Sequence, residues 1–276
     1  MLDVVDPHEV ERFAAQGSFA IVTVREAKGS TPRTAGTQML VSEITCLGSI
    51  GGGQLEYLAI DEARALLKNN AAERTLSVPL GPEIGQCCGG HVTIHIARDD
   101  EAKVSEILTR MHETKNNQPG VTVFGAGHVG RALAVALKPL PVNTLLVDTR
   151  EEELSLADPD IRKDFTALPE AHVRAAKAGS AFVILTHDHA LDFLITKEAL
   201  ERGDAAYIGM IGSKTKRAAF ASWLTKEGSD GGLMKQLTMP IGVSNLADKR
   251  PAVIAAMVAA EVMEAVGSYA AAEVPA

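Results

Sequence analysis

Residues 121–130 read Val-Thr-Val-Phe-Gly-Ala-Gly-His-Val-Gly, a short apolar run that leads into a glycine-rich turn. After the turn, Val129, Leu133 and Leu137 recur every four residues, which indicates a helix. A second strand is expected at residues 144–148. The turn has the spacing G-x-G-x-x-G in a strand–turn–helix–strand context, and this combination predicts a Rossmann-like unit.

The residues of this turn have different expected roles. Gly125 makes the tight turn, Gly127 lets the backbone approach a phosphate or pyrophosphate, and Gly130 allows close helix–strand packing. The helix start offers unpaired N–H groups to an anion. His128 is expected either to contact a ligand phosphate or to face solvent. Asp148, which ends the second strand, is placed to accept hydrogen bonds from a ribose diol.

The same alternation continues to the end of the chain. Helices and strands are expected, in order, at residues 169–178, 181–186, 190–202, 206–211 and 251–267. Strands that alternate with helices predict a parallel sheet covered on both faces.

The first half has a different pattern, with strands near residues 19–25 and 91–97 and helices near 7–16 and 54–68. We therefore predict an α+β domain over residues 1–115.

A polar run, ETKNNQPG at residues 113–120, lacks periodicity and ends in turn residues. It indicates a linker, after which the Rossmann-like domain covers residues 120–276. An ordinary loop inside one domain is the alternative.

The composition fits two globular domains. The chain has 276 residues, and 27 Lys and Arg against 35 Asp and Glu leave a net charge of −8. At about 150 residues per domain, this length predicts two domains. Values of 46% hydrophobic and 22% charged residues exclude a disordered or fibrous chain. The acidic balance argues against general nucleic-acid binding, which uses a basic face.

The expected cellular compartment follows from targeting, membrane and disulfide features that the sequence lacks. Residues 1–13 have no basic region and no apolar region of a signal peptide. The longest apolar run, residues 252–260, ends at Glu261, well short of the ~20 residues of a membrane-spanning helix. Three cysteines are too few for a disulfide framework. These features predict a cytoplasmic protein with no membrane attachment.

Cys87 and Cys88 are adjacent, within Gly-Gln-Cys-Cys-Gly-Gly at residues 85–90. A disulfide between neighbours would close a strained ring, whereas thiolates bind soft metals or carry sulfur. We predict metal or sulfur chemistry for the pair, with coincidence as the alternative. Cys46, in a strand-like stretch, is expected to be a small buried hydrophobe.

Another glycine run, residues 48–53, opens a helix and is expected to form either an anion cradle or a turn that needs positive φ. It contains Gly51, Gly52 and Gly53. Glu56 in the first helical turn would discourage an anion. Arg33 adds a cation suited to a phosphate or carboxylate.

His187, Asp188 and His189 follow a buried strand, at the sheet edge where α/β proteins bind ligands. Three roles are open for this loop: a metal site, a ligand-facing loop, or a helix cap by Asp188. Further along, Lys214, Lys216 and Arg217 are expected to form either a local basic patch or a solvated helix face.

Seven motifs occur in one order along the chain. They are Gly-Ser-Thr-Pro-Arg (29–33), Gly-Gly-Gly-Gln-Leu-Glu (51–56), Gly-Gln-Cys-Cys-Gly-Gly (85–90), the glycine turn (125–130), Thr-His-Asp-His (186–189), Gly-Met-Ile-Gly-Ser-Lys (209–214) and Pro-Ile-Gly (240–242). Together they resemble the xanthine dehydrogenase accessory protein family (XdhC/CoxI), over about residues 17–265.

The resemblance implies a chaperone of the molybdenum cofactor (molybdopterin) rather than a turnover enzyme. It implies that the protein binds the cofactor, supports its sulfuration with a cysteine desulfurase, and inserts it into a xanthine dehydrogenase-type molybdenum hydroxylase. Cys87 and Cys88 would contact the molybdenum end, and the glycine turns would hold the phosphate end. A homodimer is compatible with this reading. The expected cofactor-binding residues are Arg33, Gly51, Gly52, Gly53, Cys87, Cys88, Gly125, Gly127, His128, Gly130, Asp148, His187 and Asp188.

Two other interpretations remain open. An NAD(P)-dependent oxidoreductase would use the glycine turn and Asp148, but the sequence has no Tyr-x-x-x-Lys or other hydride-site signature. A pure interaction module that docks enzymes together would carry no small ligand.

Overall fold

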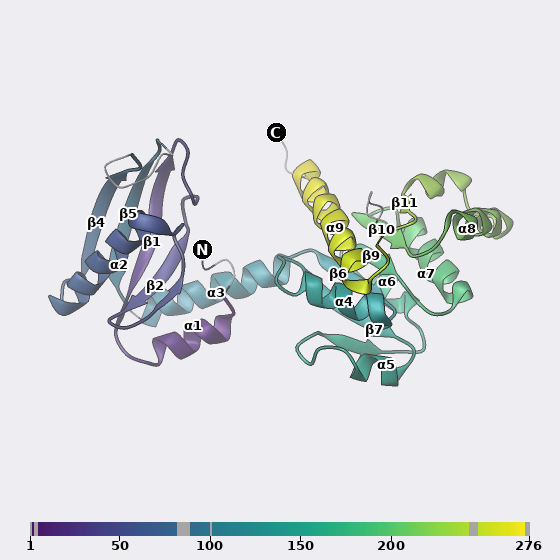
Figure 1. Cartoon of the computed structure of the whole chain (residues 1–276), viewed down its shortest axis with the longest axis horizontal. Helices are drawn as coiled ribbons and strands as arrows, with labels where there is room; N and C mark the ends of the chain where they lie inside the picture. Colours follow the sequence, from purple (N-terminus) through teal and green to yellow (C-terminus); the bar gives the residue numbers. More distant parts are fainter. Residues whose placement is uncertain (1, 3–4, 82–88, 100, 243–247, 274–276) are drawn as a thin grey trace. The chain divides into compact units, whose positions relative to one another are not determined.

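A computed structural model describes the chain except residues 1, 3–4, 82–88, 100, 243–247 and 274–276 (Figure 1). The chain forms two compact units, Met1–Thr114 and Lys115–Ala276, which we call unit 1 and unit 2. Unit 1 contains an antiparallel sheet and unit 2 a parallel one. The predicted fold class, a Rossmann-like parallel sheet preceded by an α+β domain, is confirmed.

Unit 1 is built on a five-stranded antiparallel sheet in the order β3-β2-β1-β5-β4. Its elements in chain order are α1 (Pro7–Ala14), β1 (Phe19–Lys28), β2 (Gln38–Ser42), β3 (Cys46–Gly48), α2 (Gly53–Lys68), β4 (Glu73–Pro79), β5 (His91–Arg98) and α3 (Glu101–Asn117).

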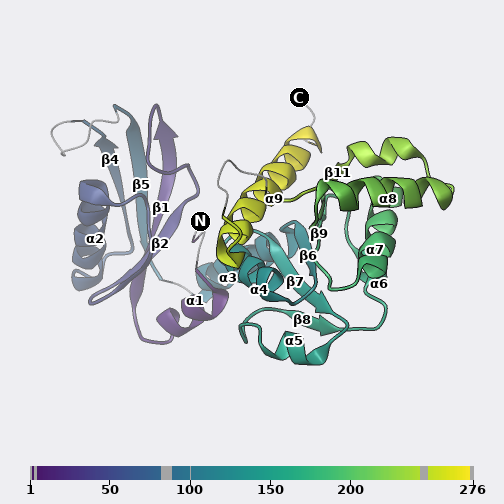
Figure 2. The same cartoon turned by 45° about the vertical axis from the view of Figure 1, so that its right-hand side comes forward.

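Helices cover both faces of this sheet (Figure 2). Strand β1 shows why, because its side chains alternate between the faces and both sets are apolar. Ala20, Val22 and Val24 pack with α2, whereas Phe19 and Ile21 pack with α1 and α3. The central strand is therefore buried on both sides.

Two expectations about this half are wrong. Residues 113–117 continue α3 rather than starting a linker, since no proline or glycine occurs before Pro119 to end the helix. Cys46 is exposed rather than buried, because β3 is an edge strand. Partial desolvation of its thiol outweighs the nearby Arg64 and raises the thiol pKa.

Unit 2 is built on a six-stranded parallel sheet in the order β11-β10-β9-β6-β7-β8. Its elements in chain order are β6 (Gly120–Phe124), α4 (His128–Leu137), β7 (Asn143–Asp148), α5 (Glu151–Ser155), β8 (Lys163–Phe165), α6 (Glu170–Ala175), β9 (Ala181–Ile184), α7 (His189–Arg202), β10 (Tyr207–Met210), α8 (Lys214–Lys226), the 3-10 helix η2 (Gly231–Lys235), β11 (Leu237–Thr238) and α9 (Pro251–Glu273).

The strand order of unit 2 reverses between β6 and β9. The chain runs outward from β6 to β8 and then returns to place β9 on the other side of β6. Ligands of open α/β sheets bind at the carboxyl ends of the strands at such a point. Helices α4 and α9 pack on one face, and α7 and α8 on the other. Val121 and Val123 face the first pair, and Phe124 the second.

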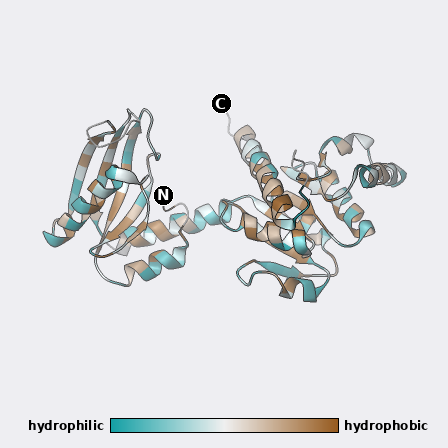
Figure 3. Cartoon of the chain, in the orientation of Figure 1, coloured by the Kyte–Doolittle hydropathy of each residue, from teal (hydrophilic) through white to brown (hydrophobic). Residues whose placement is uncertain are grey.

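Helix α9 is longer than expected. The helix continues past Glu261 to Glu273, and Pro251–Ala272 is long and apolar enough to cross a membrane by length and composition alone (Figure 3). In the structure, Tyr207 of β10 donates a hydrogen bond to Glu261 at 2.6 Å. The residues of α9 that are buried in the unit 2 core are Ala255, Val258, Ala259, Val262 and Val266. One side of the helix therefore packs on the core of unit 2, although only 28% of its apolar window is buried.

Candidate functional site

The glycine turn between β6 and α4 needs its glycines for different reasons. Gly125 has a φ of +111°, and a Cβ there would lie 2.4 Å from the Leu185 carbonyl oxygen. A Cβ on Gly130 would lie 1.8 Å from the Gly125 oxygen, so α4 packs directly on the turn. Gly127 has an ordinary φ of −65°, and no atom of the described residues lies within 4 Å of a Cβ placed there. Neither backbone conformation nor packing requires glycine at position 127, which is the N-cap of α4, where glycine is favoured over alanine.

Side chains hold both backbone polar groups of Ala126, the second residue of the turn. Asp148 Oδ2 accepts from the Ala126 N–H at 2.6 Å, and Arg131 Nη1 donates to the Ala126 carbonyl at 2.6 Å. Arg131 is itself paired with Glu153 at 2.6 Å. His128 is exposed at the first position of α4, and no side chain of the described residues caps this helix. The turn is thus fixed in a form that leaves the start of α4 open.

Asp148 is buried, with 4% of the residue exposed, and Arg150 lies against it. The Arg150 side chain donates through Nε to Oδ1 and through Nη2 to Oδ2, both at 3.1 Å. Burial by itself would raise the pKa of Asp148, but the hydrogen bonds from Arg150 and Ala126 outweigh it and hold the pKa below its usual value. Asp148 is therefore a carboxylate engaged within the protein, and no ribose is needed to explain its burial.

A buried polar cluster joins the ends of β9 and β10. The backbone N–H and the Oγ1 of Thr186 donate to Asp192 Oδ1 at 3.0 Å and 2.6 Å. Lys216 Nζ donates to Asp192 Oδ2 and to the Ile211 carbonyl. Asp192 is 0% exposed and the Lys216 side chain 11%. The cluster ties the loop after β9 to the loop after β10 at the carboxyl edge of the sheet.

His187, Asp188 and His189 are exposed beside this cluster. Asp188 Oδ1 accepts from the N–H groups of Ala190 and Leu191 at 2.7 Å and 3.4 Å, so it caps α7, which is one of its three predicted roles. Among the described residues, no group of three or more His, Cys, Asp or Glu side chains is arranged to hold a metal ion. Ligand binding by His187 stays a prediction.

Lys214, Lys216 and Arg217 form neither of the two expected features, a local basic patch or a solvated helix face. Lys216 is mostly covered in its ion pair with Asp192, and Arg217 is bonded to backbone, while Lys214 is exposed. The carbonyl acceptors of Arg217 belong to Met234, Leu237 and Met239. Two of the three charges therefore hold the fold together instead of forming a patch or a solvated face.

Three glycine-rich segments of unit 1 meet at one end of its sheet. A Cβ on Gly90 would lie 2.2 Å from the Ser30 carbonyl oxygen. A Cβ on Gly51 would lie 2.7 Å from Pro32 Cγ and 3.4 Å from Arg33 Cγ. The Gly-Ser-Thr-Pro-Arg motif therefore contacts both of the other two glycine segments. Arg33 is exposed there.

The chain's own Glu56 fills part of the predicted anion cradle. Glu56 Oε2 accepts from Ser49 Oγ at 2.6 Å and from the N–H groups of Ile50 and Gly52 at 3.0 Å each. No side chain of the described residues caps α2, which starts at Gly53. An anion at this loop therefore has the first N–H groups of α2 to bind, next to a carboxylate that repels it.

Replacing Glu56 with Ala should loosen this loop, because three donors lose their acceptor. We expect a loss of about 1–3 kcal/mol of stability and faster amide exchange at Ile50 and Gly52. Glu62→Ala on the same helix is the matched control, since its surface ion pair with Arg74 is worth only about 0–1 kcal/mol. Unchanged exchange at Ile50 and Gly52 in the Glu56 variant would contradict this role.

Cys87 and Cys88 lie outside the described residues, so their predicted contact with metal or sulfur stays a prediction. The described residues begin again at Gly89, whose N–H donates to the Leu80 carbonyl at 2.9 Å. Leu80 also donates in return, since its N–H bonds to the Gly90 carbonyl oxygen at 2.8 Å. Leu80 and the Gly89–Gly90 pair, on either side of residues 82–88, are thus bonded to each other.

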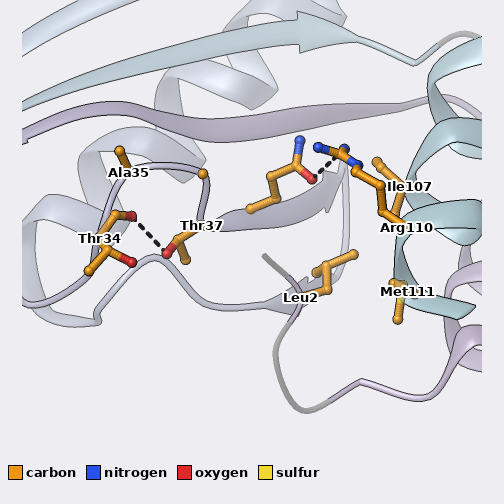
Figure 4. Close-up of a pocket in the computed structure, with 9 residues that line it drawn as sticks. Leu2, Thr34, Ala35, Thr37, Ile107, Arg110 and Met111 are labelled. Carbon is orange, nitrogen blue, oxygen red and sulfur yellow. Dashed lines mark hydrogen bonds between the residues drawn. The ribbon is translucent and has the colours of Figure 1, made fainter. Parts of the chain in front are cut away.

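A cavity of about 200 Å³ lies in unit 1 where no motif indicated one (Figure 4). Arg110 of α3 donates to Gln38 Oε1 at 3.2 Å at its side. The lining residues are Leu2, Thr34, Ala35, Gly36, Thr37, Gln38, Ile107, Arg110 and Met111. Its apolar members follow the same spacing as core residues, so the sequence carries no separate signal for the cavity.

Sequence reasoning missed the charged residues that shape the unit 2 loops. Arg131 and Arg150 belong to no motif, although Arg150 follows the strand-ending acid by two residues. Asp192 did carry a signal, because it shares the helical spacing of the buried Ile195 and Ala199. A carboxylate on an apolar helix face predicts a buried partner, which the structure identifies as Lys216.

Comparison with known families gives two matches along the chain. The family described as "XdhC Rossmann domain" matches residues 121–262, which is about half of the chain and nearly all of unit 2. The family described as "XdhC and CoxI family" matches residues 13–78 of unit 1.

Two individual proteins also resemble the chain, at low sequence identity. A protein of Escherichia coli (strain K12) described as "Uncharacterized protein YqeB" is 25% identical over 259 residues, which cover 89% of this chain and 43% of YqeB. The chain thus spans less than half the length of that relative. A crystal structure of a Bacillus halodurans protein described as a xanthine dehydrogenase is 18% identical, covers 98% of each chain and superposes with a TM-score of 0.78. This likeness shows a shared fold.

Proposed function

The chain belongs to the XdhC and CoxI family, and we propose that it acts as an accessory protein of a xanthine dehydrogenase-type molybdenum hydroxylase. In this proposal it binds molybdenum cofactor, holds it while a cysteine desulfurase supplies sulfur, and inserts it into the hydroxylase. It works in the cytoplasm, and it binds and delivers without turning over a substrate.

One observation carries the proposal, the empty space at Gly127. At this residue neither the φ of −65° nor any described atom within 4 Å of the Cβ position excludes a side chain. Glycine there leaves room for a ligand phosphate to reach the backbone N–H groups at the start of α4. The cofactor ends in a phosphate, so its charged end fits this opening.

Unit 1 by itself has residues whose chemistry suits a molybdenum centre. Arg33 is an exposed cation beside Gly51, and Cys87 and Cys88 come directly before Gly89 and Gly90 in the sequence. When bound, the cofactor supplies a soft molybdenum centre, and thiolates are the side chains that suit such a metal. The role of the chain is to bind and shield this centre.

The proposal is tested by cofactor binding and by activation of the hydroxylase. Purified protein should bind molybdenum cofactor stoichiometrically, and Cys87→Ala with Cys88→Ala should weaken binding or block activation. Cys46→Ala is the matched control, an exposed cysteine of the same unit that should behave as wild type. Normal cofactor binding and normal hydroxylase activation by the double variant would show that the two thiols have no part in the proposed function.

The NAD(P)-dependent oxidoreductase is the second candidate, and the glycine turn at the strand reversal favours it. The hydrogen bonds that Asp148 accepts from Ala126 and Arg150 oppose it, because they engage the carboxylate that would bind the ribose. Calorimetric titration with NAD(H) and NADP(H) separates the candidates, because micromolar binding would favour the oxidoreductase.

A further inference from the structure

The carboxylate of Asp148, where a dinucleotide would anchor its ribose, already has four hydrogen bonds. Oδ2 accepts from the Ala126 N–H at 2.6 Å and from Arg150 Nη2 at 3.1 Å. Oδ1 accepts from the Arg150 N–H at 3.0 Å and from Arg150 Nε at 3.1 Å. A carboxylate has about four acceptor positions, so these bonds leave none for the hydroxyls of a ribose.

The space beside Asp148 is also filled. The cavity at this carboxyl edge has a volume of about 10 Å³, roughly the space of a single water molecule. Its lining residues are Phe124, Val147, Asp148, Thr149, Pro169, Thr186 and Leu191. A nucleoside would have to displace the Arg150 side chain, which is 28% exposed and lies at the accessible side of the pair.

We propose that Arg150 is a specificity residue that keeps ligands with a free ribose diol, such as NAD+, out of the glycine turn of unit 2. Its guanidinium takes the two acceptor positions that a diol would use. Ligands that bind through a phosphate alone do not need Asp148, so the start of α4 stays available to them.

Arg150 does not offer a favourable site for the 2′-phosphate of NADP+. The charge of Arg150 is neutralised by Asp148, and Glu151, Glu152 and Glu153 follow directly in the chain. Glu153 also lies 3.8 Å from Arg150 Nη1. The surroundings are therefore net negative, and NADP+ is disfavoured by repulsion.

The experiment is calorimetric titration of wild type and Arg150→Ala with NAD+ and with NADP+. Loss of the side chain frees two acceptor positions on Asp148, so NAD+ should bind the variant at least about tenfold more tightly than wild type. NADP+ should show no such gain, because its 2′-oxygen carries a phosphate and has no proton to donate. Arg150→Gln, which also removes the charge, should show the same selective gain.

The matched control is Arg250→Ala. Arg250 bonds Asp248 two residues before it through its backbone N–H, Nε and Nη2, as Arg150 does with Asp148, but at the surface. This variant should bind NAD+ as wild type does. Wild type that binds NAD+ as tightly as both Arg150 variants, no NAD+ binding in either variant, or an equal gain for NADP+ would each overturn the inference. The test needs no molybdenum cofactor, so its failure is separate from failure of the proposed function.

Discussion

Replacing Asp192 with Ala is expected to lower the free energy of unfolding of unit 2 by about 3–5 kcal/mol. The carboxylate is fully buried and is the ionic partner of Lys216, whose side chain is also almost fully buried. Its removal leaves an ammonium group in the protein interior and takes the acceptor from Thr186. Urea unfolding followed by the fluorescence of Trp223, the single tryptophan, which lies on α8, measures the loss.

A second variant separates the charge from the rest of the cluster. Asp192→Ala combined with Lys216→Met removes both ions, so it should be less destabilised than Asp192→Ala alone. Asp158→Ala, which breaks a surface pair with Lys138, is the matched control and should cost at most about 1 kcal/mol. The assignment fails if the double variant is no more stable than Asp192→Ala.

Gly130→Ala is the second large effect, and we expect a loss of roughly 3 kcal/mol or more. The added Cβ would lie 1.8 Å from the Gly125 carbonyl oxygen, which belongs to the tight turn and cannot move without breaking it. Either the turn opens or α4 shifts away from the sheet. The same Trp223 fluorescence measurement reports the result, because the turn and α8 belong to one unit.

Gly127→Ala, three residues earlier in the same turn, is the comparison. Its Cβ would meet no described atom within 4 Å, so unfolding should change by less than about 1 kcal/mol. If a phosphate approaches Gly127 as proposed, this variant should instead bind molybdenum cofactor more weakly. Equal stability of the two alanine variants would show that the packing at Gly130 does not constrain the fold.

Much of unit 2 could be predicted from residues 121–130 and the alternation that follows, because glycine spacing and strand–helix order are local in sequence. Elements with short or weak patterns were missed, including β8 and β11, which have three and two residues. In unit 1, β2, β4 and α3 were also missed. The polar residues 113–117 read as a linker because α3 buries little of its length, and propensity alone did not decide the matter.

The sequence by itself determined the family, the parallel sheet and the places where glycine is required, because these depend on residue order and backbone conformation. Only the tertiary structure decided which charges meet. Asp148 pairs with Arg150, Lys216 with Asp192 across two helices, and Glu56 with the loop before its own helix. A motif shows that an acid or a base is present, but the partner that satisfies a buried charge comes from chain packing. That packing engages Asp148 within the protein and leaves no described atom within 4 Å of a Cβ at Gly127.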